Sequence, residues 1–293
     1  MPAYFTYYFS NNTIQLMKSK VLFGKMFILL SFSMMAVSLW AQDQKSSTGF
    51  VPQVGQQGKD VVWVPTPQEL VDKMLEMAKV TPSDFLIDLG SGDGRTVITA
   101  ARLGANALGI EYNPEMVTLS KENAEKAGVS DRAKFMEADL YKTDLSGATV
   151  ITMFLLPEIN LKLRPRLLDL KPGTRIVSNT FTMGEWEEDY KVETDENWNS
   201  WNTAYLWIVP AKAGGKWKLG NGELDLTQEY QMLRGTLKNG GKTYPVTDGR
   251  LRGDEITFTA NGDKYSGKVN GNTMQGTLEN TSRGTKSDWT CTR

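Results

Sequence analysis

Short apolar segments alternate with helix-type patterns through the middle of the chain, from Val61 to Pro210. Apolar runs bounded by turn residues are typical of buried strands, whereas apolar positions three and four apart indicate helices. The alternation predicts an α/β domain, residues 61–211, with a largely parallel sheet covered on both faces by helices. Residues 42–60, rich in Gln, Ser and Gly, are expected to be a linker. The expected strands are 85–87, 107–111, 133–136, 148–156, 175–178, 190–193 and 205–209.

Local sequence marks two helix starts in this domain. Thr66-Pro67-Gln68-Glu69 has the form of a capping box with proline at the first helical position, and an apolar face from Leu70 to Ala78 follows it. Asn113 before Pro114 predicts a second start, because an Asn side chain accepts hydrogen bonds from the free backbone N–H groups there. Gly128 is expected to end that helix.

The sequence changes character after Ala211. Little helix pattern remains, and short alternating segments are separated by turn pairs such as Asn239-Gly240, Asp248-Gly249 and Asn270-Gly271. Such pairs favour the tight turns of β-hairpins. They predict a second domain, residues 216–293, of about six to eight antiparallel strands that form an open sheet or a barrel.

The start of the chain is typical of a protein that is exported. A basic stretch at Lys18–Lys25 precedes an apolar run at Met26–Trp40. This order predicts a signal peptide, residues 1–41, cleaved at its last residue, with translation starting at Met17. The expected localisation is the periplasm. The alternative is an inner-membrane anchor formed by an uncleaved segment, residues 21–41.

Composition narrows the available chemistry. The 293 residues include no histidine and one cysteine, Cys291. An intrachain disulfide and a cysteine-based metal site are therefore excluded. Without histidine, the commonest general base and the commonest metal ligand are both missing, so no metal is expected. Acids exceed bases over residues 42–211, and bases exceed acids over residues 212–293. This asymmetry fits either two ordinary surfaces, or an acidic site for a cationic substrate beside a basic domain with an anionic partner.

A glycine-rich loop follows the first expected strand. Residues 88–97 read DLGSGDGRTV, with three glycines at alternate positions before a helix. Glycine lets the backbone turn sharply and approach a ligand closely, and the helix adds its N-terminal dipole. The spacing matches neither a G-x-G-x-x-G pyrophosphate loop nor a Walker loop. Glu111 ends the second strand, where an acid faces ribose hydroxyls in doubly wound sheets, and Asp139 follows the third, where an acid can accept from the amino group of a base.

These residues lead to a family. From Val61 to Pro210 the chain resembles the class I S-adenosylmethionine-dependent methyltransferases. The resemblance rests on the loop Asp88–Gly94, on Glu111, on Ala138-Asp139 and on the turn Leu170–Gly173 before the fifth strand. It implies a Rossmann-like seven-stranded sheet whose final strand is antiparallel. It also implies S-adenosyl-L-methionine as the cofactor and S-adenosyl-L-homocysteine as the product, with no metal.

The resemblance assigns roles to the strand ends. It implies that the glycine loop lies against the methionine part of the cofactor, that Glu111 binds the ribose and that Asp139 binds the adenine edge. The residues expected to bind the cofactor are Asp88, Gly90, Ser91, Gly92, Asp93, Gly94, Glu111, Tyr112, Ala138, Asp139 and Leu140.

Four motifs resemble an exported bacterial subgroup. They are Val64–Pro67, Gly90–Arg95, Phe154–Pro157 and Tyr205–Pro210. That subgroup in turn resembles the mitochondrial protein-lysine methyltransferases, which implies a protein lysine amine as the methyl acceptor. Two alternatives stay open: a small-molecule methyltransferase, and a non-catalytic S-adenosylmethionine-binding module of the cell envelope.

The acceptor side is marked less clearly. Methyltransferases acting on base or amide nitrogens often carry Asp/Asn-Pro-Pro-Tyr after the fourth strand, where this chain reads Phe154-Leu155-Leu156-Pro157-Glu158. A nucleic-acid partner is therefore not expected, and the acidic balance of the domain agrees. Glu158 is the candidate for orienting the acceptor. Trp63, Pro65 and Pro157 are expected on the substrate side or in a lid, and the C-terminal domain is expected to contact a partner, the envelope or a membrane surface.

Overall fold

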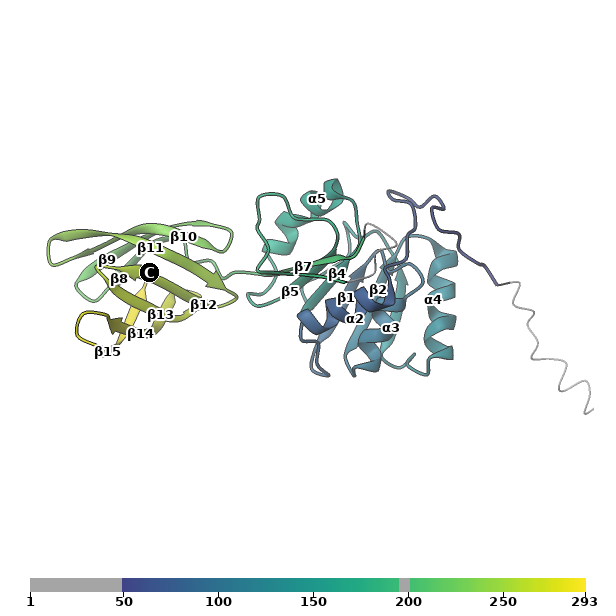
Figure 1. Ribbon diagram of the computed structural model, residues 1–293, viewed down its shortest axis with the longest axis horizontal. Helices are drawn as coiled ribbons and strands as arrows, with labels where there is room; N and C mark the ends of the chain where they lie inside the picture. Colours follow the sequence, from purple (N-terminus) through teal and green to yellow (C-terminus); the bar gives the residue numbers. More distant parts are fainter. Residues whose placement is uncertain (1–48, 195–200) are drawn as a thin grey trace, which may run out of the picture. The chain divides into compact units, whose positions relative to one another are not determined.

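A seven-stranded sheet forms the first part of the computed structural model, which describes residues 49–194 and 201–293. Figure 1 shows the chain as a ribbon. Residues Val51–Arg293 form one compact unit. The predicted signal peptide and the start at Met17 lie outside the described residues. No helix within the described ranges is long and apolar enough to cross a membrane.

The sheet has the order β3-β2-β1-β4-β5-β7-β6. Its first five strands in that order run parallel, and β7 is antiparallel to both β5 and β6. This arrangement confirms the predicted Rossmann-like sheet with an antiparallel final strand. The strands are β1 (Phe85–Leu89), β2 (Asn106–Glu111), β3 (Ala133–Glu137), β4 (Val150–Met153), β5 (Arg175–Asn179), β6 (Tyr190–Glu193) and β7 (Thr203–Ile208).

Helices cover both faces of this sheet, as predicted (Figure 1). They are α2 (Gln68–Met77), α3 (Arg95–Arg102), α4 (Pro114–Lys126) and α5 (Pro157–Leu168). One hydrophobic core joins the buried sides of α2, α3 and α4 to one face of the sheet, and a second core joins α5 to the other face. Burial of these faces from water is the main favourable contribution to folding of the domain. The expected strand 148–156 is longer than the observed β4, because the chain leaves the sheet after Met153 to form the wall of a cavity.

The two predicted helix starts have different outcomes. At α4 the Asn113 side chain accepts from the backbone N–H groups of Glu115 and Met116, so that prediction is confirmed. At α2 the capping box is wrong: the N-cap is Pro67, and no side chain caps the helix. The hydroxyl of Thr66 is engaged elsewhere, since it accepts a hydrogen bond from Asn179 at the end of β5.

The last eight strands close into an antiparallel barrel. They follow one another in chain order, and β15 returns to pair with β8. The barrel interior is filled by side chains, including the stacked rings of Phe258 and Tyr265 and the buried Trp217. Its strands are β8 (Gly215–Leu219), β9 (Gly222–Glu229), β10 (Met232–Asn239), β11 (Lys242–Arg252), β12 (Glu255–Ala260), β13 (Asp263–Asn270), β14 (Thr273–Asn280) and β15 (Thr285–Thr292). The predicted all-β architecture is confirmed, with closure of the barrel.

Candidate functional site

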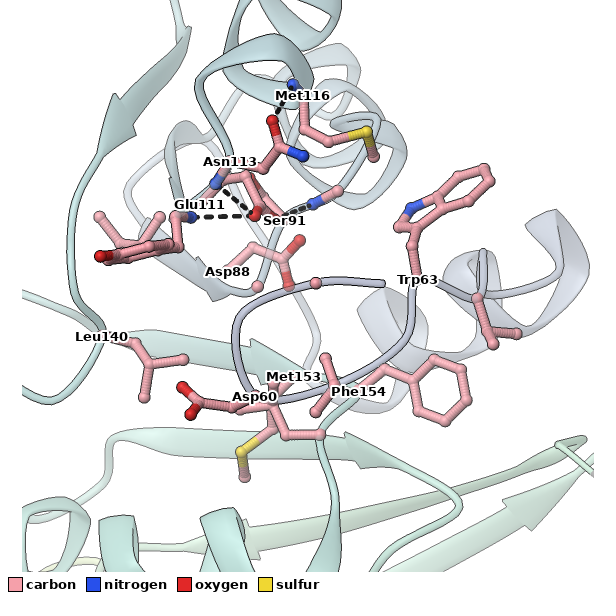
Figure 2. Close-up of a pocket in the computed structure, with 18 of the residues that line it drawn as sticks. Asp60, Trp63, Asp88, Ser91, Glu111, Asn113, Met116, Leu140, Met153 and Phe154 are labelled. Atoms are coloured by element: carbon pink, nitrogen blue, oxygen red, sulfur yellow. Dashed lines mark hydrogen bonds between the residues drawn. The ribbon is translucent and has the colours of Figure 1, made fainter. Parts of the chain in front are cut away.

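A cavity of about 410 Å³ lies at the carboxyl ends of the parallel strands, where the strand order makes neighbouring loops diverge. The residues that follow β1, β2, β3 and β4 contribute to its walls. The remaining cover comes from a segment N-terminal to the sheet, residues 55–63, which we call the strap. Figure 2 shows Asp60 and Trp63 on the strap, with Asp88, Ser91 and Glu111 drawn among the residues that line the cavity.

The glycine loop needs its glycines for two reasons. Gly90, Gly92 and Gly94 all have positive φ, at 77°, 53° and 84°. L-residues with side chains rarely adopt this conformation. There is also no room for side chains. A Cβ atom on Gly92 would lie 2.6 Å from Nε1 of Trp63, and one on Gly94 would lie 2.7 Å from the ring of Phe135.

Glu111, at the end of β2, holds this loop through its carboxylate. Its Oε2 accepts a hydrogen bond from the backbone N–H of Gly92 at 3.0 Å. Its Oε1 accepts from the N–H groups of Tyr112 and Asn113 at 2.9 and 3.0 Å, as the dashed lines in Figure 2 show. The carboxylate is thereby fixed in orientation, and Oε2 keeps acceptor capacity for a hydroxyl group.

Asp88, at the end of β1, is buried in the wall of the cavity. Burial raises the pKa of its carboxyl group to about 7, and the nearby charges of Glu111 and Asp93 act in the same direction. The hydroxyl of Thr152 on β4 donates to Oδ1 of Asp88 at 2.7 Å, which opposes the rise. A positively charged ligand beside this carboxyl would stabilise its ionised form.

Asp139, beyond the end of β3, accepts hydrogen bonds both from the backbone that follows it and from the strap. Its Oδ1 accepts from the N–H of Tyr141, and its Oδ2 accepts from Nζ of Lys59 at 3.1 Å. These two bonds hold the pKa of Asp139 below its ordinary value, the backbone bond being the larger cause. Lys59 also lies 4.4 Å above the ring centre of Tyr112. The tip of the strap is thus bound to the residues expected to hold an adenosine group.

The strap is a small hairpin. The prediction of a linker over residues 42–60 is therefore wrong for the C-terminal part of that range. Backbone hydrogen bonds join Gly55 and Gln56 to Trp63, and Gly58 to Val61. Residues 56–60 line the cavity. The composition of residues 42–60 indicates a linker because Gln and Gly are frequent in mobile chains, but the turn at Gly55, with φ of 85°, lets the backbone satisfy its own hydrogen bonds here.

A second set of hydrogen bonds ties Thr66, which lies between the strap and α2, to both sides of the site. Arg95, which follows the glycine loop, pairs with Asp93 and donates from Nη1 to the carbonyl oxygen of Thr66 at 2.7 Å. The Thr66 hydroxyl accepts from Nδ2 of Asn179 at 3.2 Å. Thr66 therefore connects the glycine loop with the end of β5.

The cavity fits S-adenosyl-L-methionine in its donor and acceptor groups. The Ser91 hydroxyl is buried without a hydrogen-bond partner in the described chain, and it lies against Gly109, where a Cβ atom would come within 2.5 Å of it. The acceptors at Asp88, Glu111 and Asp139 suit a ligand with a cationic end, ribose hydroxyls and an amino group on its base. The glycine loop provides the close backbone approach that such a ligand needs.

Three aromatic side chains line the same cavity beyond β4, β5 and before β7. The ring centres of Phe154 and Phe181 are 6.1 Å apart with nearly parallel planes. Trp201 meets Phe154 edge to face, with a centre-to-centre distance of 5.9 Å. These rings come from the strands that do not carry the glycine loop, Glu111 or Asp139.

The structure brings together most of the residues predicted for the site. Those lining the cavity are Trp63, Pro65, Asp88, Gly90, Ser91, Gly92, Asp93, Glu111, Tyr112, Ala138, Asp139 and Leu140. Gly94 is buried behind the loop as the N-cap of α3. Pro157 and Glu158 are exposed in the first turn of α5 and are not among the lining residues, so the structure gives no support to Glu158 as the group that orients the acceptor.

Sequence reasoning missed several residues of the site. Lys59 and Asp60 were hidden in the expected linker, and Thr152 stands inside an apolar strand where its hydroxyl has no visible partner in sequence. Phe181 and Trp201 lie outside the motifs, and their only signal is that they flank the ends of expected strands. Within the described part of the chain, no group of three or more Asp, Glu or Cys residues is arranged to hold a metal ion.

The sheet order, the glycine loop and the two acids at successive strand ends define a class I S-adenosylmethionine-dependent methyltransferase. A profile of the ANTKMT methyltransferase domain matches residues 88–190. A protein-lysine N-methyltransferase of Saccharolobus islandicus is 46% identical over 154 residues, which cover 51% of this chain and 94% of that protein. The chain therefore belongs to this family of S-adenosylmethionine-dependent methyltransferases.

Two further relatives match parts of the chain. The adenine nucleotide translocase lysine N-methyltransferase of Mus musculus is 33% identical over 129 residues, covering 43% of this chain and 56% of the mouse protein. The matched segment thus spans little more than half of that relative. A structure from Salinibacter ruber, described as an RNA methyltransferase in complex with S-adenosyl-L-homocysteine, is 48% identical, with a TM-score of 0.48, and covers 51% of this chain and 95% of that chain.

Proposed function

We propose that the protein transfers a methyl group from S-adenosyl-L-methionine to the ε-amino group of a lysine in another protein. The observation that carries the proposal is the cavity itself. On one side it has the glycine loop, Glu111 and Asp139, and on the other it opens past aromatic rings after β4 and β5. The Saccharolobus relative, matched over nearly its whole length, is named for lysine methylation and supports this acceptor.

In this proposal the chain contributes mainly by positioning. The bound cofactor supplies a methyl group that is already electrophilic because it is carried on a sulfonium sulfur. Asp139 and Glu111 would hold the nucleoside, and Asp88 and the glycine loop would hold the amino-acid end, because all of them line the cavity. The strap, which also lines the cavity, would exclude water there. Alignment of nucleophile and methyl group supplies most of the rate in such a transfer.

A lysine amine must lose its proton before it can attack. The chain has no histidine for that purpose. The part of the cavity beyond β4 is apolar, with Leu155, Leu156 and Ile159 among its lining residues. Removal of an ammonium group from water into such surroundings lowers its pKa, so the proton can leave to solvent as the side chain enters.

The acceptor class can be tested directly. The full chain is incubated with methyl-labelled S-adenosyl-L-methionine and a bacterial lysate, and the products are separated by size and analysed for methyl-lysine by mass spectrometry. Label on protein lysine supports the proposal. Label only in small molecules favours a small-molecule methyltransferase, and S-adenosyl-L-homocysteine binding without any labelled product favours the non-catalytic envelope module. Gly92→Arg is the control that should abolish all labelling.

For localisation we propose export to the periplasm, with cleavage after Ala41. The support is the order of basic stretch, apolar run and small residues at the start of the chain. N-terminal sequencing of the protein from cell fractions tests this proposal. An uncleaved chain in the inner-membrane fraction indicates the anchor formed by residues 21–41, and an unprocessed chain in the cytosol contradicts both.

We also propose that residues 61–211 form the methyl-transfer domain and that the barrel, residues 216–293, contacts a partner or the envelope. The excess of basic residues over acidic ones after Ala211 supports an anionic partner. Deletion of residues 212–293 tests the idea. If neither the location of the protein nor its methyl transfer changes, the barrel has no such role.

A further inference from the structure

Three aromatic rings at the edge of the cavity form a surface whose chemistry the cofactor does not require. Phe154 directly follows β4, Phe181 follows β5, and Trp201 precedes the antiparallel β7. Because β7 runs opposite to β4 and β5, its beginning lies at the same edge of the sheet as their ends. Residues from three adjacent strands therefore meet at one place, beside the part of the cavity left for the methyl acceptor.

All three rings line the cavity, so a ligand there would contact aromatic surface. Phe154 and Phe181 are stacked with an interplanar angle of 22°, and Trp201 is inclined by 62° to Phe154. Each of the three is only partly buried. The face of an aromatic ring carries negative charge density and attracts an ammonium or methylammonium group without forming an ion pair.

The backbone that carries Phe181 is held in an unusual conformation. Thr180 has φ of 62°, in the left-handed region that a β-branched residue rarely adopts. Strained backbone of this kind persists only where the surroundings hold it in place. Asn160 on α5 supplies such support, because its buried Nδ2 lies 3.2 Å from the carbonyl oxygen of Phe181 and 3.3 Å from that of Thr182. The position of the ring is therefore built into the fold.

We propose that Phe154, Phe181 and Trp201 form an aromatic subsite that binds the ammonium end of the acceptor side chain and its methylated products. This inference rests on the proposed lysine methyl transfer and specifies how the acceptor is recognised. Ring faces attract the charged amine on arrival, and they also tolerate the neutral amine that must attack. A carboxylate in the same place would stabilise the proton that has to leave.

A pair of probes that differ in charge separates cation recognition from simple apolar contact. Choline carries a quaternary ammonium group, and 3,3-dimethylbutan-1-ol has nearly the same shape without the charge. Binding of each to the full chain, saturated with S-adenosyl-L-homocysteine, is measured by calorimetry or ligand-observed NMR. The subsite predicts that choline binds at least about fivefold more tightly than the neutral probe.

Two variants and one control complete the test. Phe181→Leu and Phe154→Leu keep apolar bulk but remove a ring face, and each should reduce the preference for choline to less than about twofold. Tyr190→Leu removes an exposed aromatic ring on β6, outside the cavity, and should leave the preference unchanged. Binding of S-adenosyl-L-homocysteine by every variant shows that the domain is folded.

The outcomes separate this subsite from the proposed function. Equal affinity of the two probes for the unaltered chain, or a full preference retained in both Leu variants, overturns the subsite even if lysine is methylated. A clear preference for choline that both Leu variants lose supports the subsite. Absence of methyl-lysine in the lysate assay alongside that preference instead overturns the choice of acceptor.

Discussion

Thr66 and Asn179 are 113 positions apart in the sequence, and the buried amide of Asn179 donates to the Thr66 hydroxyl at 3.2 Å. The carbonyl oxygen of Thr66 accepts from Arg95, the first residue after the glycine loop. One residue of the segment before α2 thereby joins the loop expected to hold the cofactor with the strand that leads to Phe181. A change at Thr66 should consequently affect both sides of the cavity.

Thr66→Val keeps the shape of the side chain but removes the acceptor for the Asn179 amide. An unsatisfied buried donor costs about 1–3 kcal/mol, so we expect a loss of that size in the free energy of unfolding, together with weaker binding of S-adenosyl-L-homocysteine. Urea denaturation followed by tryptophan fluorescence measures the first effect, and calorimetry the second. Thr66→Ser, which keeps the hydroxyl, is the control. In the double variant Thr66→Val/Asn179→Ala the two losses should not add, and full additivity would argue against a direct bond.

The glycine loop allows backbone strain to be separated from crowding. Gly92→Ala introduces a Cβ atom 2.6 Å from the indole nitrogen of Trp63, whereas Gly128→Ala, at a similar φ of 69°, meets open space. Both should lose roughly 1 kcal/mol of stability through φ strain. Only Gly92→Ala should weaken binding of S-adenosyl-L-homocysteine by about tenfold or more, because Trp63 and the strap must move. Equal affinities in the two variants, measured by calorimetry, would contradict this role of Gly92.

Burial of Asp88 predicts a pH-dependent stability. With its pKa raised from 3.8 to about 7, the folded protein keeps a proton on Asp88 between roughly pH 4 and 7 that the unfolded chain has released. The contribution of this group to the free energy of unfolding therefore falls as the pH rises through that window, by about 1.4 kcal/mol for each pH unit crossed. Asp88→Asn keeps an acceptor for Thr152 and removes the effect.

The measurement is a comparison of urea denaturation curves at several values between pH 5 and 8.5. Relative to the unaltered protein, Asp88→Asn should become progressively more stable as the pH rises, by at most about 3 kcal/mol between pH 5 and the plateau above pH 7. Asp131→Asn, at an exposed surface position, provides the matched change of carboxylate to amide. A stability difference for Asp88→Asn that is the same at every pH would contradict a buried, protonated Asp88.

The tip of the strap should govern how fast the cofactor leaves. Lys59 reaches Asp139 at 3.1 Å, and both side chains keep contact with water, so salt weakens their attraction. We expect Lys59→Met to leave the thermal stability unchanged and to speed dissociation of S-adenosyl-L-homocysteine several-fold in low salt, with a smaller difference in high salt. Stopped-flow fluorescence measures the rate, and Lys121→Met, on the exposed surface of α4, is the control. Asp139→Asn should instead weaken equilibrium binding about tenfold.

The sequence predicts the sheet and the loop because both have local signatures. Buried strands give apolar runs, and glycines at positions 90, 92 and 94 meet a need of the backbone that only glycine fulfils without strain. The acids at 111 and 139 could be placed because the carboxyl ends of parallel strands share one edge.

The rest of the site depends on contacts between distant segments, which carry no local signature. The sequence around Thr66 predicts a helix cap, yet its hydroxyl accepts a hydrogen bond from Asn179 at the end of β5. The sequence around Lys59 predicts a linker, because nothing nearby in sequence indicates that Lys59 forms a hydrogen bond with Asp139. Phe181 and Trp201 both come to contact Phe154 only because β7 pairs antiparallel with β5.

Cys291 offers a specific probe of the barrel, because it is the only cysteine in the chain. Its side chain is fully buried among the core residues of the barrel, and burial raises the pKa of its thiol to about 12. Since the thiolate is the reactive form, the native protein should not react with Ellman's reagent at pH 8, and one thiol should become reactive when the barrel unfolds. Reaction in urea, followed beside S-adenosyl-L-homocysteine binding, therefore tests whether barrel and cavity unfold together. Rapid labelling of the native chain would show that β15 opens readily or that the thiol is accessible, contrary to a closed barrel with Cys291 inside.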